Sequence, residues 1–379
     1  MSIERITARA IRVPVERPTR MSTRNLDRRE YLLVEVESGG VVGVGYSYAG
    51  TRGGLLLAAA VDEVLAPVLK YRGEDKILSL WQEMYQEALL LGRRGAVLRA
   101  VSALDIALWD LRAKLCGVPL CVLLGGSTDP VPAYASGGYY RPDEGPWELV
   151  VAKEIEFNQT LGFTDHKIKV GGLSVEEDAR RVAAAIEAIG GNGRLALDAN
   201  NAYRSVAEAL RATRAFERAA GATGLWWMEE PFSPEDVEGH RRLAAELEIP
   251  VATGEIHQTR WEFRQLIESR AVDLLQPDAG VLGGVSEWLC VARAAATFDL
   301  QVAPHWHANL HAHLAAATPN CLAVEHFALE KGIYNFESLL TTSSRLEVRD
   351  GAVVPPSRPG IGIELDEDAV GRFSVRGDR

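Results

Sequence analysis

From about residue 131 onward, short apolar segments alternate with longer segments of helical spacing, and this alternation constrains the fold more than any other feature. The segments with strand character span 131–136, 166–170, 194–198, 224–229, 250–254, 272–276, 300–304 and 321–325. Helical periodicity occupies 174–189, 203–219, 234–246, 259–269 and 283–297. Repeated strand–helix units predict parallel strands, and eight of them predict a closed α/β barrel of the TIM type. An open doubly wound sheet is the alternative, disfavoured because no glycine-rich GxGxxG loop is present.

The first third of the chain has a different pattern, and 379 residues exceed what one compact core usually holds. Strands are expected at 3–15, 30–37 and 41–48, followed by helices at 53–69, 76–91 and 95–116. We therefore predict an α+β domain over 1–127 and the barrel over 128–339. The strand-like, turn-rich segment 340–379 is expected to pack back on the first domain.

Charge and cysteine usage exclude several classes of protein. The net charge of -11 disfavours nucleic-acid binding, which requires a basic surface. No apolar run approaches the roughly 18 residues of a membrane helix, and the first residues lack the apolar core of a signal peptide. None of the four cysteines forms a CxxC pair. We therefore expect a cytoplasmic protein without a disulfide framework or a cysteine metal site.

Ionisable residues recur at the carboxyl ends of the expected strands. They are Lys167, Lys169, Asp198, Glu229, Glu255, Asp278, His305 and Glu325. Successive groups are separated by about one strand–helix unit. Because the carboxyl ends of barrel strands all face the same mouth, these side chains are expected to converge on one active site.

Three carboxylates from neighbouring strands, Asp198, Glu229 and Glu255, predict a metal site. Carboxylates brought together raise one another's pKa unless a cation lies among them. Oxygen ligands suit Mg²⁺ first and Mn²⁺ second. Glu230 is a rival for Glu229, because strand alternation directs only one of them inward. Surface acids scattered by chance are the alternative.

Two sets of candidate bases accompany the acids. Lys167 and Lys169 share one strand face, where two ammonium groups would lower each other's pKa and favour a neutral amine. An exposed edge strand is the alternative. Asp278 would fix the tautomer of His305 and raise its basicity, which makes an acid–base pair. A zinc cluster of His307, His311 and His313 is the competing interpretation of the histidine-rich stretch.

These residues, in this order, resemble the enolase superfamily, and within it the mandelate racemase subgroup. The motifs that carry the resemblance are Lys167-Ile168-Lys169, Asp198-Ala199-Asn200, Glu229-Glu230-Pro231, Gly254-Glu255, Gln276-Pro277-Asp278 and Pro304-His305. The helix Ser102–Asp110 and Leu124-Gly125-Gly126 add to it. The resemblance spans nearly the whole chain. It implies an α+β capping domain over a modified (β/α)7β barrel.

The resemblance also implies roles for the site residues. Glu229 is then the ligand, Lys169 is the base on one face of the substrate, and the Asp278–His305 pair works on the other. Lys167 and Glu325 would contact the two oxygens of the substrate carboxylate. Asn200 and Ser136 are implied as substrate contacts. The family habit implies a homo-oligomer, from dimer to octamer.

Polarity near the expected mouth suggests a hydroxylated substrate. The arginines Arg17, Arg20, Arg24, Arg28 and Arg29 lie in a segment expected to be a loop over the site, and we select Arg20 as a contact. Tyr139, Tyr140, Arg141 and Asn309 add hydroxyl-seeking groups, and Tyr139 is selected from these. A solvated loop is the alternative for the arginines.

The expected substrate is a small carboxylate, a sugar acid, that loses its α-proton in a Mg²⁺-dependent reaction to give an enediolate. Stabilising this dianion requires the metal, Lys167 and a donor such as a protonated Glu325. Elimination of the β-hydroxyl would then give a 2-keto-3-deoxy acid. A racemase or epimerase that uses the same intermediate is the first alternative. A non-catalytic metal-binding barrel is the second.

Overall fold

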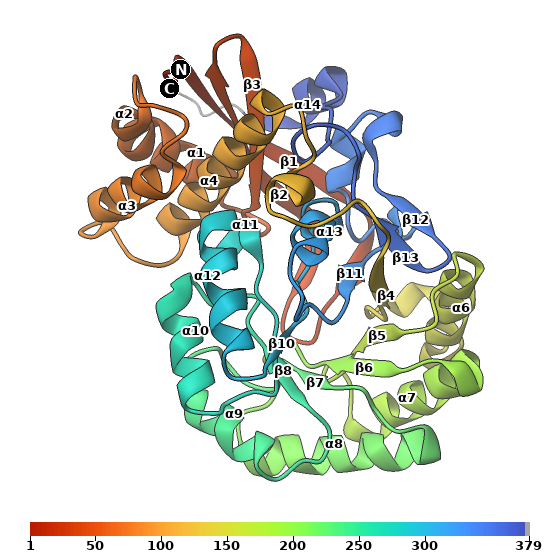
Figure 1. The fold of residues 1–379 in the computed structure, drawn as a ribbon. Helices are drawn as coiled ribbons and strands as arrows, with labels where there is room; N and C mark the ends of the chain where they lie inside the picture. Colours follow the sequence, from red (N-terminus) through yellow and green to blue (C-terminus); the bar gives the residue numbers. More distant parts are fainter. Residues whose placement is uncertain (376–379) are drawn as a thin grey trace.

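The computed structural model describes residues 1–375, with only the backbone of Pro18. The chain forms two parts: a small sheet covered by helices, and a larger barrel that lies below it in Figure 1. No helix within the described residues is long and apolar enough to cross a membrane.

The amino-terminal part is an antiparallel sheet covered by helices. The sheet order is β14-β1-β2-β3, with β1 (Arg5–Arg20), β2 (Asn25–Ser38) and β3 (Val41–Tyr48) joined in sequence. The helices are α1 (Gly54–Ala60), a π-helical turn (Val61–Leu65), α2 (Ala66–Leu69), α3 (Ile77–Ala88) and α4 (Ala96–Leu115). A Cβ at Gly45 would lie 2.0 Å from the carbonyl oxygen of Ala103, so only glycine lets α4 lie this close to β3.

The carboxyl-terminal part contains eight parallel strands in sequential order. They are β4 (Val131–Gly137), β5 (His166–Lys169), β6 (Leu195–Asp198), β7 (Met228–Glu229), β8 (Val251–Thr253), β9 (Leu274–Leu275), β10 (Gln301–Val302) and β11 (Val324–His326). β11 pairs with β4 in parallel, and the backbone of Val302 in β10 bonds to Asn320 and Leu322 just before β11. The strands therefore return on themselves as a barrel.

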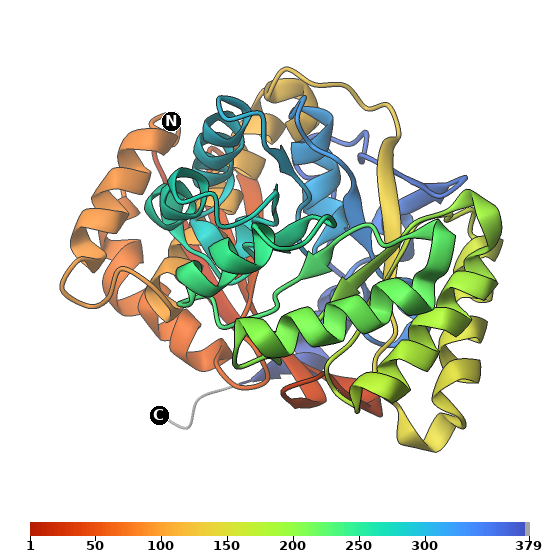
Figure 2. The same cartoon turned by 90° about the horizontal axis from the view of Figure 1, so that it is seen from below.

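Helices surround these strands (Figure 2). They are α6 (Trp147–Thr160), α7 (Val175–Ile189), α8 (Val206–Ala220), α9 (Val237–Ala244), α10 (Thr259–Glu268), α12 (Val285–Ala296) and α13 (Ala308–Ala316). Two short helices, α5 (Leu120–Leu123) and α11 (Ala279–Leu282), lie before β4 and after β9. The amino terminus of α7 is fixed by a capping box, in which the side chains of Ser174 and Glu177 each accept a hydrogen bond from the backbone of the other.

The final segment returns to both parts. β12 (Glu347–Arg349) and β13 (Ala352–Val354) form a hairpin whose second strand pairs with β4. Helix α14 (Glu367–Phe373) then leads into β14 (Ser374–Val375), which pairs with β1. The division at residues 127 and 339 stays a prediction.

One buried layer inside the barrel explains the position of the charged residues. Tyr134, Ala196, Trp227, Ala252, Leu274, Ala303 and Ala323 form a cluster with one member from each of seven strand segments. Alternate residues of a strand share a face. Ser136, Asp198, Glu229, Gln276, His305 and Glu325 each follow a member of this layer by two positions. They therefore stand directly above an apolar floor, towards the carboxyl ends of the strands.

The segment 17–29, expected to be a loop, is mostly a β-hairpin. β1 extends to Arg20 and β2 begins at Asn25, with a register irregularity between Pro14 and Thr19. The Ser22 hydroxyl donates to the Val170 carbonyl (2.5 Å), and the Thr23 hydroxyl donates to the Asn200 carbonyl (3.1 Å). The hairpin tip therefore lies across the carboxyl ends of β5 and β6, and these two hydrogen bonds attach it to the barrel.

Candidate active site

Asp198, Glu229 and Glu255 meet at the carboxyl ends of β6, β7 and β8. One oxygen from each carboxylate lies within 4.8 Å of the others, and Asp198 and Glu229 are fully buried. Asp198 and Glu229 are register partners, which places both on the inner face. Glu230 follows with a positive φ of 43° and belongs to no such group. The geometry therefore selects Glu229 over Glu230.

The three carboxylates fit a hard divalent cation. Mg²⁺ binds oxygens at about 2.1 Å in an octahedron, so opposite ligands lie about 4 Å apart. The three oxygens, all within 4.8 Å of one another, are therefore close enough together to bind one such cation after side-chain adjustment. Burial and the neighbouring carboxylates raise the pKa of Glu229 to about 8, a cost that a bound cation would remove.

Two groups that sequence analysis did not assign fix the orientation of Glu229. The Trp227 indole N–H donates to Oε2 of Glu229 at 3.0 Å, and the Gln276 amide donates to the same oxygen at 2.5 Å. Oε1 is left to face Lys167. The sequence carries a signal for both residues. Gln276 begins the motif Gln276-Pro277-Asp278, and Trp227 lies two residues before Glu229, on the same strand face.

Both lysines of β5 are ion-paired. The Lys167 ammonium lies 2.5 Å from Glu229 and 2.7 Å from Glu325, and the Lys169 ammonium bonds to Asp198. Burial acts to lower the pKa of Lys169, but Asp198 outweighs it and the pKa is raised. Lys167 does act to lower the pKa of Lys169, as expected, but the expectation of a neutral amine is wrong for this arrangement because the carboxylates dominate.

His305 and Asp278 form a hydrogen-bonded pair on the other side. Nδ1 of His305 lies 2.9 Å from Oδ2 of Asp278, whose other oxygen accepts from the Gly280 N–H at 2.7 Å. Nε2 lies 3.4 Å from Glu255. Burial would lower the pKa of His305, but Glu255 and Asp278 outweigh it and raise the pKa to about 9. The pairing of Nδ1 with Asp278 leaves Nε2 directed towards the cluster of three carboxylates.

Glu325 closes the site from β11. Its Oε2 accepts from the Trp306 N–H at 2.7 Å, and its Oε1 faces Lys167. Burial would raise the pKa of Glu325, but Lys167 outweighs burial and lowers the pKa to about 2. The expectation of a protonated Glu325 is wrong for this state of the site, because Lys167 stabilises the ionised form.

The predicted substrate contacts divide into two groups. Ser136 is the register partner of Lys167, and both its hydroxyl and the side-chain oxygen of Asn200 are buried without a hydrogen-bond partner. The Tyr139 ring lies 5.1 Å from the Lys169 ammonium. These three residues surround the site. Arg20 is exposed and its guanidinium donates to the Gly172 carbonyl, so its role as a substrate contact stays a prediction.

The zinc interpretation of the histidines is not supported. His311 bonds to the Trp306 carbonyl and accepts from the Ala279 N–H, and His313 accepts from the Cys121 N–H. Burial lowers the pKa of each of these histidines. Within residues 1–375, the three carboxylates are the only such group of side chains with metal-site geometry.

Family models cover most of the chain. A model described as "Mandelate racemase / muconate lactonizing enzyme, N-terminal domain" matches residues 5–125. A model described as "Enolase C-terminal domain-like" matches residues 151–369.

Curated relatives match over nearly their whole length. An arabinonate dehydratase from Saccharolobus solfataricus is 35% identical over 356 residues, which cover 92% of this chain and 91% of the relative. An L-talarate/galactarate dehydratase from Salmonella typhimurium is 36% identical and covers 89% and 81%. A D-galactarolactone cycloisomerase from Agrobacterium fabrum is 34% identical and covers 99% of both.

Solved structures share the fold. A racemase from Streptomyces coelicolor with bound magnesium superposes with a TM-score of 0.90 at 31% identity, covering 98% of this chain and 100% of that one. An L-talarate dehydratase from Polaromonas sp. JS666, complexed with Mg and L-glucarate, gives 0.88 at 32% identity, covering 99% and 98%. The relatives thus include enzymes that eliminate water and enzymes that isomerise.

Proposed function

The chain belongs to the mandelate racemase/muconate lactonizing enzyme family of the enolase superfamily, and from this premise we propose that it is a Mg²⁺-dependent sugar-acid dehydratase. The observation that carries the proposal is the carboxylate cluster of Asp198, Glu229 and Glu255, flanked by Lys169 and by the His305–Asp278 pair. The named dehydratase relatives support sugar acids as the substrate class.

The reaction begins at a weakly acidic C–H bond beside the substrate carboxylate. Lys169 takes this α-proton once its amine is neutral, and the pair of electrons moves into the carboxylate to give an enediolate. Mg²⁺ bound by the three carboxylates would supply the positive charge that stabilises the second negative charge. Lys167 donates to one carboxylate oxygen and thereby shares this task.

Elimination requires an acid on the other side of the substrate. Protonated His305 gives its Nε2 proton to the β-hydroxyl, the C–O bond breaks, and water leaves. The resulting enol tautomerises to a 2-keto-3-deoxy acid. Asp278 holds Nδ1–H throughout, which keeps Nε2 as the reacting nitrogen. A placed acid or base contributes about 10²–10⁴-fold to such a step.

Epimerisation is the second candidate, because the same two bases stand on opposite sides of the cluster. If His305 returns a proton to the α-carbon instead of the hydroxyl, the product is the epimer. The racemase among the solved relatives supports this outcome. A non-catalytic barrel would have no use for both bases.

A library of sugar acids, incubated with the protein and Mg²⁺, tests the proposal through the appearance of 2-keto acid. The expected result is keto acid from at least one member, lost in Lys169→Ala and in His305→Asn and retained in the exposed-site control Arg93→Ala. α-Proton exchange without any keto acid would reject dehydration in favour of epimerisation. Neither exchange nor product from any member would favour the non-catalytic barrel.

Further aspects of this enzyme are part of the same proposal. We infer the modified (β/α)7β form of the barrel, the three-part division at residues 127 and 339, and the roles of Ser136, Asn200 and Tyr139 as substrate contacts. A cytoplasmic location and a homo-oligomer are also inferred. The family models matching residues 5–125 and 151–369 support the separation of the first domain from the barrel. The unpartnered buried oxygens of Ser136 and Asn200 support their roles, the cysteine usage supports the location, and the habit of the family supports the oligomer.

A further inference from the structure

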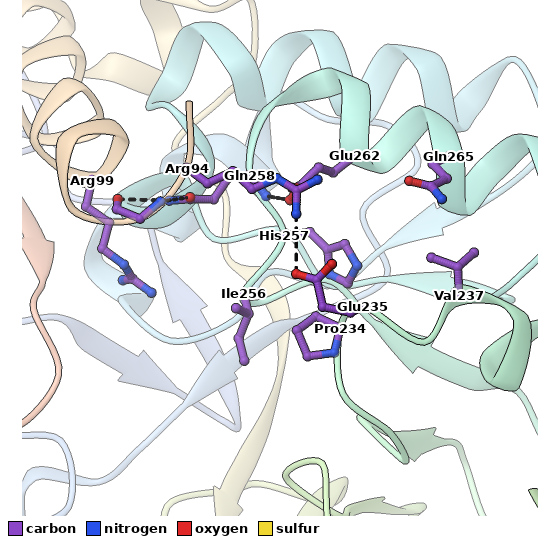
Figure 3. A pocket seen from close by; sticks show the side chains of 11 residues that line it. Arg94, Arg99, Pro234, Glu235, Val237, Ile256, His257, Gln258, Glu262 and Gln265 are labelled. Carbon is purple, nitrogen blue, oxygen red and sulfur yellow. Dashed lines mark hydrogen bonds and ion pairs between the residues drawn. The ribbon is translucent and has the colours of Figure 1, made fainter. Parts of the chain in front are cut away.

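A cavity lies beside the segment that follows Glu255, because Ile256 and His257 line it. It has a volume of about 240 Å³ and lies between the start of α4 and the loops that follow β7 and β8 (Figure 3). Arg94, Arg99, Pro234, Ile256, His257 and Gln258 are among the residues that line it. Ile256 directly follows Glu255, so the cavity wall continues from a metal ligand.

The exposed edge of the site faces the same way. The side chains of Glu255 and His305 are 14% and 15% exposed, whereas those of Asp198, Glu229 and Asp278 are almost completely buried. A substrate whose carboxylate sits among the buried groups must therefore extend its other end past Glu255 and His305. The cavity is lined by Ile256 and Arg99, and Asp278 and Glu255 are near enough to Arg99 to affect its pKa.

Arg99 is the unpaired cation of this cavity. Its guanidinium donates one hydrogen bond, to the Tyr48 carbonyl at 2.8 Å, and no carboxylate within residues 1–375 forms an ion pair with it. Arg94 differs, because it is paired with both Glu235 and Glu262. Burial lowers the pKa of Arg99, although Asp278 and Glu255 are near enough to oppose this. A partly buried guanidinium without a counter-ion is a ready site for an anion.

Two more features suit an anion in this cavity. Arg24, at the tip of the hairpin, is also close enough to affect the pKa of Arg99, which brings a second guanidinium near the cavity. His257 is 5% exposed, and both of its ring nitrogens are buried without a hydrogen-bond partner. Gln258 holds the start of α4 to the barrel through bonds to Gly95 and to the Val281 carbonyl, which fixes the position of Arg99.

We propose that Arg99 binds a second carboxylate at the distal end of the substrate, so that this enzyme selects sugar diacids over sugar monoacids. This inference rests on the proposed function, since it names the substrate class of the same site. The curated relatives include enzymes named for an aldonic acid and for aldaric acids, so the family alone does not decide between the two classes. The charge and position of Arg99 make the distinction.

The test compares kcat/KM for six-carbon diacids and for the matching monoacids. A charge-assisted, bidentate contact makes the expected diacid-to-monoacid ratio fall about 10–100-fold in Arg99→Met. Arg99→Lys should restore part of the ratio, and Arg93→Met, a change at an exposed arginine outside the cavity, should leave it unchanged. A wild type that prefers monoacids, or a ratio that Arg99→Met does not alter, would overturn the inference about Arg99. Formation of 2-keto acid in the same assay would still support the dehydratase proposal.

A binding measurement separates recognition from folding and turnover. The diacid and the monoacid are each titrated calorimetrically into Lys169→Ala in the presence of Mg²⁺. The diacid should bind more tightly, and this difference in affinity should vanish in Lys169→Ala/Arg99→Met. Equal binding of both acids by Lys169→Ala would contradict a distal carboxylate contact. If sodium sulfate instead alters turnover of a monoacid in an Arg99-dependent way, the cavity serves a free anion and the inference fails.

Discussion

Replacing Trp227 by phenylalanine tests whether the floor of the barrel orients the metal site. The substitution keeps an aromatic ring but removes the N–H that donates to Glu229 at 3.0 Å. Hydrogen bonds to charged groups contribute about 1.5–3 kcal/mol, and the smaller ring loses further apolar contact. Because Gln276 still donates to the same oxygen, we expect the free energy of unfolding to fall by roughly 2–4 kcal/mol in total.

Metal affinity should fall as well. Partners that orient a metal ligand typically change affinity by about 10–100-fold, and we expect this range for Trp227→Phe with Mg²⁺. The matched control is Trp226→Phe, one position away, where the ring stacks on Arg194 and, among the described residues, does not donate a hydrogen bond to Glu229. Calorimetric Mg²⁺ titration and urea unfolding of both variants measure the two quantities. Equal Mg²⁺ affinity in Trp227→Phe and Trp226→Phe would refute the positioning role of Trp227.

Two further predictions concern stability. His166 is 1% exposed without a partner for either ring nitrogen, and burial lowers its pKa to about 4. Between about pH 6.5 and pH 4 the unfolded chain binds a proton at His166 that the folded chain does not bind. The free energy of unfolding therefore falls as the pH drops from about 6.5 to 4, by up to about 3 kcal/mol. Urea unfolding of His166→Met should therefore show a shallower slope in that window, and an unchanged slope would contradict this cause. Gly45→Ala should destabilise by about 3 kcal/mol or more, because its Cβ would overlap the Ala103 carbonyl, whereas Gly191→Ala should change stability by less than about 0.5 kcal/mol. Similar melting temperatures for these two variants would contradict the packing argument.

The barrel and the charged residues at the carboxyl ends of its strands could be predicted, because both depend on the periodicity of apolar residues within short segments. Alternation within a strand places a residue two positions beyond each apolar floor residue on the same face, so Asp198 follows Ala196 and Glu325 follows Ala323. Glu255 breaks this step, since it follows Ala252 by three positions. The strand β8 ends at Thr253, and the turn through Gly254 brings Glu255 to the cluster.

The hairpin over residues 17–29 could not be predicted from local pattern. Its arginine- and proline-containing sequence has no clear alternation, and its strands are held by tertiary contacts such as Thr23 to the Asn200 carbonyl. For the same reason the partner of Arg20, the Gly172 carbonyl, could not be predicted from the sequence.

The charge states of the site residues depend on partners far away in sequence. The pair Lys167 and Lys169 indicated mutual repulsion, but each ammonium finds a carboxylate from another strand. The same holds for Glu325, whose ionised form is stabilised by Lys167. Residue types and spacing identified the groups, while only the assembled barrel determines which neighbour dominates.

The account depends on one cation held by residues 198, 229 and 255, with a base on each side of the substrate. Incorporation of solvent deuterium at the α-carbon of a sugar acid, followed by proton NMR, measures this most directly. We predict exchange in the wild type with Mg²⁺, no exchange after chelation, a loss of about 10²-fold or more in Lys169→Ala, and exchange without 2-keto acid product in His305→Asn. Full exchange after thorough chelation, or in Lys169→Ala, would contradict the central claim.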